Sequence, residues 1–403
     1  MKKFISIVMS LLLIFALCTT ANAATVSSEC DISDIDIPLE VSTTVTEIGQ
    51  TLDIKAKSAV LMEPITGKIL YESNPDELLP PASITKIMSL LIVMEAIDDG
   101  RLSLEDNISA SEHACSMGGS QIWLEPNETM TVNELLKAAV IASANDATVA
   151  LGEAIAGSEE GFVVMMNERA KQLGMNNTTF KNCTGLDAEG HLTTAHDVAV
   201  MSCDLIKHDL IKNYSTVWMD TLRGGESELV NTNKLVRFYK GTTGLKTGTT
   251  SGAGYCLSAT AERDGMQLAA VIMCGDTSAD RFEGAKKLLD YGFANYKFTE
   301  VLPELEKGKC IAVEKGTEKS VKVTANGTLG LLLKKTDTSN IKQETVIKES
   351  IKAPIKKGDT VGSINVYIGD EQVGAIDITA ADSIKRKSLM TVIRWLICGL
   401  FTP

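Results

Sequence analysis

The sequence predicts two folded domains: an α/β (α+β) domain over residues 51–298 and a small all-β domain over residues 299–380. In the first region, helical apolar patterns are inserted between strand patterns at its two ends, which is typical of a domain that packs helices on a sheet. Beyond Phe298 the chain changes to Lys-rich, β-branched alternation with Asn-Gly and Gly-Asp turn signals. The length of 403 residues also exceeds what one hydrophobic core usually supports.

The first domain opens with two short strand patterns, 58–62 and 68–71, around a Pro-Ile-Thr-Gly turn. Two prolines then precede a long apolar helix over residues 82–97, which Gly100 closes because glycine readily ends a helix. The later elements follow from apolar periodicity: helices at 132–142, 146–155, 160–173, 195–207 and 280–291, and strands at 245–250, 255–262 and 266–274.

Residues 1–23 have the composition of a secretory signal peptide. Lys2 and Lys3 precede a short apolar run, and small residues at Ala21 and Ala23 mark a cleavage site before Ala24. An uncleaved membrane anchor is the alternative. We expect export, and we read residues 24–50, rich in Ser, Thr and acids, as a leader to the fold.

Residues 383–403 form a basic, amphipathic pattern. Apolar residues recur at helical spacing, and Arg394 interrupts a run that is shorter than the roughly 20 residues a membrane span needs. A helix of this kind, with Trp395 and Phe401, suits the interface of an anionic membrane. We therefore expect a peripheral anchor that holds the exported protein on the outer face of the cytoplasmic membrane. The alternative is a helix packed on the protein's own body.

The composition argues against several other classes. Formal net charge is -13, from 39 basic and 52 acidic residues, so no nucleic acid is expected as a partner. The cysteines beyond the signal stand singly, without a Cys-x-x-Cys pair or a metal-like spacing with the four histidines. No metal, no other cofactor and no disulfide framework is therefore predicted.

The first motif with chemical meaning is Ser83-x-x-Lys86, at the start of the long apolar helix. Residues three apart on a helix lie on the same side, so the hydroxyl and the amine are neighbours. Burial lowers the pKa of a lysine, and a lysine that titrates near neutrality can take the proton of the serine. The spelling is weak by itself, because Ser339-x-x-Lys342 repeats it in a strand region. The alternative is a helix start followed by a solvated lysine.

Two further motifs strengthen this interpretation. Ser143-Ala144-Asn145 lies between two helical patterns, where it could present a hydroxyl and an amide, although a helix cap is its simpler explanation. Lys246-Thr247-Gly248 begins a strand and could hold a carboxylate while the backbone comes close, although an ordinary strand with a solvated lysine is the alternative. Together, in the order nucleophile, loop and strand, the three motifs predict serine acyl transfer.

The chain resembles the serine-type, low-molecular-mass penicillin-binding D-alanyl-D-alanine carboxypeptidases (peptidase S11-like). The resemblance covers about residues 50–298 and includes stretches beyond the three motifs, namely 59–71, 79–88, 185–191, 244–248 and 253–256. It implies a catalytic domain like that of serine beta-lactamases and penicillin-binding transpeptidases. The following all-β domain and C-terminal amphipathic helix agree with the family's layout.

The resemblance also implies a mechanism. Ser83 would attack the carbonyl of the penultimate D-Ala in a peptidoglycan stem pentapeptide ending in D-Ala-D-Ala, Lys86 would act as the base, and Ser143 would relay a proton. The backbone N–H groups of Ser83 and Thr249 would form the oxyanion hole. Beta-lactam antibiotics would acylate Ser83 and leave slowly. The implied substrate-binding residues are Asn145, Lys246, Thr247, Gly248, Thr249 and Arg281.

Three other functions stay open at this point. A DD-endopeptidase would use the same residues. A class A beta-lactamase would need a Glu-x-x-x-Asn stretch after the Ser-x-Asn motif, and the candidate beginning at Glu168 ends in Gln172. A non-catalytic, membrane-bound penicillin-binding scaffold would have no need of all the motifs together.

Overall fold

The computed structural model describes residues 52–337 and 340–388. The predicted signal peptide, the leader and most of the predicted amphipathic tail lie outside the described residues. Within the described residues no helix has the length and apolar character needed to cross a membrane.

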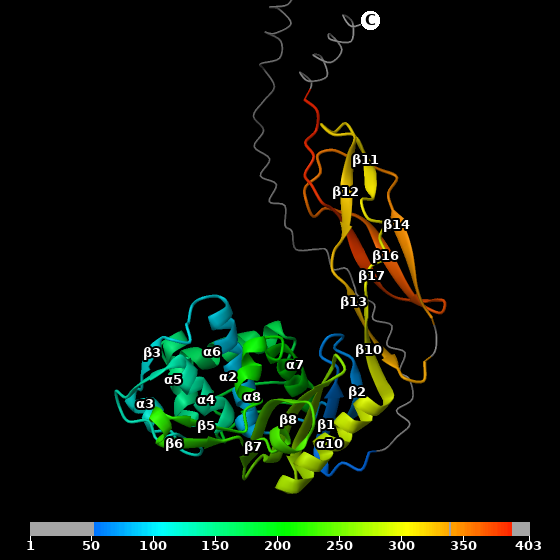
Figure 1. The fold of residues 1–403 in the computed structure, drawn as a ribbon. Helices are drawn as coiled ribbons and strands as arrows, with labels where there is room; N and C mark the ends of the chain where they lie inside the picture. Colours follow the sequence, from blue (N-terminus) through cyan, green and yellow to red (C-terminus); the bar gives the residue numbers. More distant parts are fainter. Residues whose placement is uncertain (1–51, 338–339, 389–403) are drawn as a thin grey trace, which may run out of the picture. The chain divides into compact units, whose positions relative to one another are not determined.

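A five-stranded antiparallel sheet forms the base of the N-terminal domain, with strand order β2-β1-β9-β8-β7 (Figure 1). Its strands are β1 Ala56–Met62, β2 Ile69–Ser73, β7 Thr242–Thr250, β8 Gly254–Arg263 and β9 Met266–Gly275. Both ends of the domain's sequence therefore contribute to one sheet. The strands predicted from the sequence are all present.

Both faces of this sheet are covered. Alternate residues of β1 show it: Ala59 and Leu61 pack in a cluster with α10 (Ser278–Asn295), whereas Val60 and Met62 pack in the larger cluster with α2 (Lys86–Asp98) and α7 (Ala195–Leu205). Because neither face meets water, β1 is a continuous apolar run rather than an alternating one.

The helical part lies between β2 and β7 in sequence. Its longer helices after α2 are α4 Val132–Ile141, α5 Asn145–Ala156, α6 Glu159–Gln172 and α7. Its short elements are β3 Asn107–Ser109, α3 Glu112–Cys115, β4 Thr129–Thr131, η2 Asp209–Ile211, α8 Lys212–Ser215, β5 Met219–Leu222, η3 Arg223–Gly225, β6 Ser227–Val230 and α9 Leu235–Phe238. Side-chain caps begin α4, α6, α7 and α10, whereas α2 and α5 have none. At α4, Thr131 and Glu134 form a reciprocal capping box.

The helix predicted over residues 82–97 is present with one difference. Its first turn is a 3-10 turn, η1 (Ala82–Thr85), and the α-helix begins only at Lys86. Ala82 has a φ of +48°, a left-handed conformation after the two prolines, so the chain enters the helix through a sharp bend. The bend places Ser83, which is half-buried, at the start of an otherwise buried helix.

The C-terminal part is all-β, as predicted. β10 (Tyr296–Val301) pairs with β13 (Leu329–Lys334), and a second sheet has the order β14-β16-β17-β12-β11-β15 (Figure 1). Its strands are β11 Cys310–Glu314, β12 Ser320–Ala325, β14 Ile341–Ile347, β15 Ser350–Lys352, β16 Thr360–Ile368 and β17 Glu371–Ala380. Ile364 and Ile378 are among the fully buried residues of its core.

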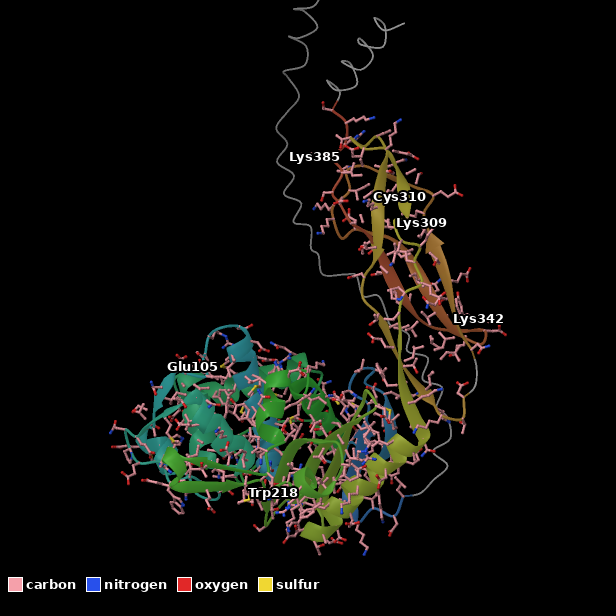
Figure 2. The ribbon with its side chains drawn as sticks, viewed as in Figure 1. Glu105, Trp218, Lys309, Cys310, Lys342 and Lys385 are labelled. Carbon is pink, nitrogen blue, oxygen red and sulfur yellow. The ribbon has the colours of Figure 1, made fainter. Side chains whose placement is uncertain are left out.

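The C-terminal part also contains the Ser339-x-x-Lys342 repeat and the sequence Ser363-Ile364-Asn365, which has the pattern of the Ser143-Ala144-Asn145 motif. Lys342, labelled in Figure 2, is exposed on β14, and Ser363 and Asn365 lie on β16. None of these three residues starts a buried helix or a loop between helices. Their surroundings in the fold thus differ from those of the matching motifs in the N-terminal domain.

Candidate active site

Ser83 and Lys86 meet at the bend between η1 and α2. Ser83 is half-buried, whereas Lys86 is fully buried, and the Lys86 Nζ lies 3.1 Å from the Ser83 Oγ. The predicted proximity of the hydroxyl and the amine is therefore present. It depends on the 3-10 turn, in which residues three apart lie almost in line.

Lys86 has two further partners, both from distant parts of the sequence. Its Nζ donates to the Asn145 Oδ1 at 2.5 Å and to the Thr184 carbonyl at 2.8 Å. Burial lowers the pKa of Lys86 to about 7, although the nearby Asp146 carboxylate and Cys183 thiol act in the opposite direction. A neutral amine can keep both of these donor bonds and turn its lone pair to the Ser83 hydroxyl.

Ser143 and Asn145 lie at the junction of α4 and α5. Ser143 is buried and has a φ of +62°, and Asn145 is the first residue of α5. The Asn145 side chain donates to the Gly118 carbonyl at 2.6 Å and its backbone N–H donates to the Ser120 carbonyl at 2.6 Å. Asn145 therefore joins the Lys86 amine to the 118–120 loop, and the strained turn orients Ser143 beside it.

Lys246 on β7 has a buried amine without a counter-charge. It is 1% exposed, and its Nζ has no hydrogen-bond partner among the described residues. Burial, together with the positive charges of Lys86 and Arg281, holds the pKa of Lys246 well below 10.5. A buried donor left unsatisfied is costly, so this amine is prepared for an incoming anion.

Gly248 lets β7 approach the nucleophile closely. A Cβ on Gly248 would lie 3.0 Å from the Ser83 backbone nitrogen and 3.0 Å from the Ala82 Cβ. A side chain at this position would therefore push the strand away from η1. The next residue, Thr249, is exposed.

Arg281 reaches this strand from α10. It is 8% exposed, and its Nη1 donates to the Gly248 carbonyl at 3.0 Å and to the Thr249 Oγ1 at 2.9 Å. Thr247 donates its hydroxyl proton to the Thr232 Oγ1 at 2.7 Å. All the residues predicted for the site therefore lie on η1, α2, the α4–α5 junction, β7 or the start of α10, and the contacts above link most of them directly.

The turn at residues 182–185 also belongs to the site, and its role was not predicted from the sequence, where residues 185–191 entered only through the resemblance. Asn182 accepts the N–H groups of Thr184 and Gly185 at 3.2 and 2.7 Å, which shapes the turn that presents the Thr184 carbonyl to Lys86. Gly185 has a φ of +87°, and a Cβ there would lie 1.8 Å from the Ala82 carbonyl oxygen. An Asn followed closely by Gly was a usable turn signal for this segment.

His191 supports the same segment rather than the chemistry. Its Nε2 lies 2.9 Å from the Thr85 Oγ1, and its Nδ1 accepts the Lys181 N–H at 3.3 Å. Burial lowers the pKa of His191 to about 4, so the ring is neutral at physiological pH. A cavity of about 400 Å³ opens between this segment and η1, lined in part by Ala82, Leu186 and Asp187.

The fold and the site define a class of protein. Helices cover both faces of a sheet, and at the start of one of them a half-buried serine lies beside a lysine of lowered pKa. The strand β7, which approaches this serine, contributes a buried amine without a hydrogen-bond partner. Among the described residues no group of His, Cys, Asp and Glu could hold a metal ion. The protein is therefore of the class that forms acyl-enzymes on serine with a lysine base.

Comparison with known proteins identifies the family. The family model described as D-alanyl-D-alanine carboxypeptidase matches residues 43–277, and the model of the penicillin-binding protein 5 C-terminal domain matches residues 299–386. The chain belongs to the D-alanyl-D-alanine carboxypeptidase family of penicillin-binding proteins. It is a serine D-Ala-D-Ala carboxypeptidase, which agrees with the resemblance noted in the sequence.

Several relatives illustrate the match. The D-alanyl-D-alanine carboxypeptidase DacF of Bacillus subtilis (strain 168) is 42% identical over 344 residues, which is 84% of this chain and 88% of the relative. The crystal structure of penicillin binding protein 5 from Haemophilus influenzae has a TM-score of 0.70 and 30% identity, and covers 84% of this chain and 99% of its own. Penicillin-Binding Protein D2 from Listeria monocytogenes, in its ampicillin-bound form, has a TM-score of 0.56 and 33% identity, and covers 60% of this chain and 100% of its own.

Proposed function

We propose that the chain removes the terminal D-Ala from peptidoglycan stem pentapeptides through an acyl-enzyme on Ser83. The observation that carries this proposal is the 3.1 Å contact between the Ser83 hydroxyl and an amine whose pKa burial lowers to about 7. At neutral pH about half of the Lys86 amines are unprotonated and can accept the serine proton. The carboxypeptidase family membership supports the same reaction.

In acylation, Lys86 takes the proton as the Ser83 Oγ bonds to the carbonyl carbon of the penultimate D-Ala. The oxygen that becomes negative lies against the N–H groups of Ser83 and Thr249, at the place where Gly248 allows β7 to come near. The tetrahedral intermediate collapses by breaking the C–N bond. The leaving D-Ala nitrogen takes a proton that Lys86 gave up, relayed by Ser143.

The terminal carboxylate of the substrate would pair with the Lys246 amine on β7 and favour its protonated form. Lys246 is buried without a partner, so an anion that reaches it gains a charge-assisted bond and removes an unfavourable state of the free enzyme. The Thr247 and Thr249 hydroxyls would turn their protons from their present acceptors, the Thr232 Oγ1 and the Gly248 carbonyl, to the carboxylate. Arg281 adds positive charge close to the Thr249 Oγ1. The Asn145 amide would hold the substrate backbone from the opposite side.

Deacylation then needs a water molecule, activated by the same lysine. A beta-lactam forms the same ester with Ser83, but its leaving nitrogen remains tethered after ring opening. We therefore propose that beta-lactams bind this chain covalently, which the ampicillin-bound form of the Listeria relative supports. The carboxypeptidase names of the relatives favour this function over a beta-lactamase or a scaffold.

One set of incubations tests these assignments. The protein is incubated separately with labelled penicillin, with a pentapeptide ending in D-Ala-D-Ala and with a cross-linked muropeptide dimer, beside Ser83→Ala as the control. Slow loss of the penicillin label together with release of free D-Ala is the expected result. Rapid penicillin turnover would indicate a beta-lactamase, cleavage of cross-linked dimers in place of pentapeptide would indicate an endopeptidase, and no Ser83-dependent reaction would indicate a scaffold.

We further propose that residues 1–23 direct export and that residues 383–403 hold the enzyme on the outer face of the cytoplasmic membrane. The basic, amphipathic sequence of the tail supports the second point. Sedimentation with anionic vesicles, with and without residues 383–403, tests it. Equal sedimentation of both forms contradicts the anchor.

A further inference from the structure

Trp123 is an exposed aromatic residue in a strained backbone conformation. Its side chain is 74% exposed, and its φ is +59°, in the left-handed region that a bulky residue rarely adopts. Both neighbours, Ile122 and Leu124, are buried. The loop therefore places two apolar side chains inside and an indole outside, although an exposed indole contributes little to folding.

Hydrogen bonds from two sides hold this conformation. The buried Asp146 carboxylate accepts the N–H groups of Ile122 and Leu124, each at 3.1 Å from its Oδ2. Arg223 donates to the carbonyl of Ile122 at 3.0 Å and to the carbonyl of Trp123 at 3.4 Å. The peptide groups on both sides of the indole are thus fixed by charged partners, so the ring is presented on a rigid support.

The same loop is attached to the active site. Asn145, which accepts from the Lys86 amine, also donates hydrogen bonds to the carbonyls of Gly118 and Ser120. Trp123 follows Ser120 by three residues, which limits the distance between their Cα atoms to about 10 Å. Asp146, which clamps the Trp123 backbone, is the residue next to Asn145.

We propose that Trp123 is a platform on which a sugar ring of the glycan strand stacks while its stem peptide occupies the active site. The inference rests on the function proposed above. A pyranose presents a flat face of C–H groups with a rim of hydroxyls, and an indole offers a flat apolar face with one N–H donor. An open platform suits an extended glycan, whereas a peptide side chain is usually recognised in a concave pocket.

The length of the substrate agrees with this position. The scissile carbonyl is separated from the sugar by the stem peptide, whose four residues span at most about 14 Å when extended. We place the nearer stem residues over Ser83 and Asn145, which directs the sugar toward the 121–124 loop that Asn145 and Asp146 hold. Trp123 would then add affinity for substrates that carry the glycan and leave sugar-free peptides unaffected.

Paired substrates test the proposal. D-Ala release is measured with a disaccharide pentapeptide and with the same pentapeptide without sugar, for the wild type and Trp123→Ala. We expect kcat/KM for the disaccharide substrate to fall about fivefold to tenfold, through KM, and kcat/KM for the free peptide to stay within about twofold. Phe238→Ala removes another aromatic, 65% exposed on α9, and should change neither substrate.

A second variant separates contact with the sugar from damage to the loop. Trp123→Gly removes the indole but suits a φ of +59°, so its melting temperature should equal or exceed that of the wild type while the loss on the disaccharide substrate persists. An equal loss on both substrates, or no loss on either, overturns the proposal.

Binding to Ser83→Ala gives a measurement that does not need turnover. By calorimetry, the Kd of Ser83→Ala for the disaccharide pentapeptide should rise about fivefold to tenfold when Trp123→Ala is added. If the wild type releases no D-Ala from either substrate, the proposed reaction fails, and this binding difference still decides the role of Trp123. An unchanged Kd overturns it.

Discussion

The acylation rate should follow the deprotonation of Lys86. Burial lowers the pKa of this amine to about 7, and only the neutral form can accept the Ser83 proton. The neutral fraction is about one-tenth at pH 6 and about nine-tenths at pH 8. The second-order rate of acylation by a neutral-side-chain penicillin should therefore rise roughly ninefold between these values and then level off.

Intact-protein mass spectrometry after short exposures to penicillin measures this rate across the pH range. The substrate's own ionisation is constant over the range, so the rising limb reports the enzyme. A limb centred above pH 9 would mean that Lys86 stays charged in the free enzyme, and a flat profile between pH 6 and 8 would remove Lys86 as the base. Either result would refute the reasoning from burial.

The same shift has a consequence for stability. Because the pKa of Lys86 is lowered in the folded state, the unfolded chain binds more protons between pH 7 and about 10.5, and the free energy of unfolding should rise with pH across that window. Lys86→Met removes this contribution. Urea titrations at pH 6 and 9 should show a smaller pH dependence in the variant than in the wild type.

Three further changes test the support of the site. Gly185→Ala should lower the free energy of unfolding, measured by chemical denaturation, by about 3 kcal/mol and abolish acylation, because its Cβ would lie 1.8 Å from the Ala82 carbonyl oxygen. The control Gly174→Ala, with a φ of +74° and open space, should lower it by only about 1 kcal/mol. Equal losses would contradict the close approach of Gly185 to Ala82. Asp146→Asn should move the acid limb of the acylation profile to lower pH, because the carboxylate raises the pKa of Lys86; a shift upward would contradict this. Arg281→Lys should lower kcat/KM for D-Ala release about thirtyfold, the equivalent of about 2 kcal/mol, by losing the Nη1 donor that holds the Gly248 carbonyl and the Thr249 Oγ1, without moving the pH limb. Activity equal to that of the wild type would show these two bonds to be dispensable.

Much of the fold followed from local sequence patterns. The strands predicted at 245–250, 255–262 and 266–274 lie within β7, β8 and β9, and the helix predicted at 280–291 lies within α10. These elements were predictable because apolar periodicity, turn residues and caps act within a few residues. The 3-10 turn at Ala82 was not, because its left-handed φ is set by the packing of Gly185 and Gly248 against η1.

The residues of the active site likewise include some that were predictable from the sequence and some that were not. The spacing of Ser83 and Lys86 was readable, as was the order of the three motifs. The Thr184 carbonyl, by contrast, lies 98 residues from Lys86 in sequence and has no side-chain signal, since any residue provides a carbonyl. The Ser339-x-x-Lys342 repeat lies in a Lys-rich strand region, so the sequence already argued against a catalytic role for it. The structure gives the physical reason: Lys342 is exposed on β14, so burial does not lower its affinity for a proton.

The sequence by itself determined which chemical groups the active site contains, because the identity and local spacing of side chains can be read directly from the chain. These groups are a serine and a lysine one turn apart, a second serine with an asparagine, and a Lys-Thr-Gly strand. Only the tertiary structure decided their states. Distant segments of the chain decide which groups are shielded from water and which find partners. Three features depend on this: the lowered pKa of Lys86, the unpaired amine of Lys246 and the exposed indole of Trp123. Burial and counter-charge are properties of the surroundings, and those surroundings exist only once the chain has folded.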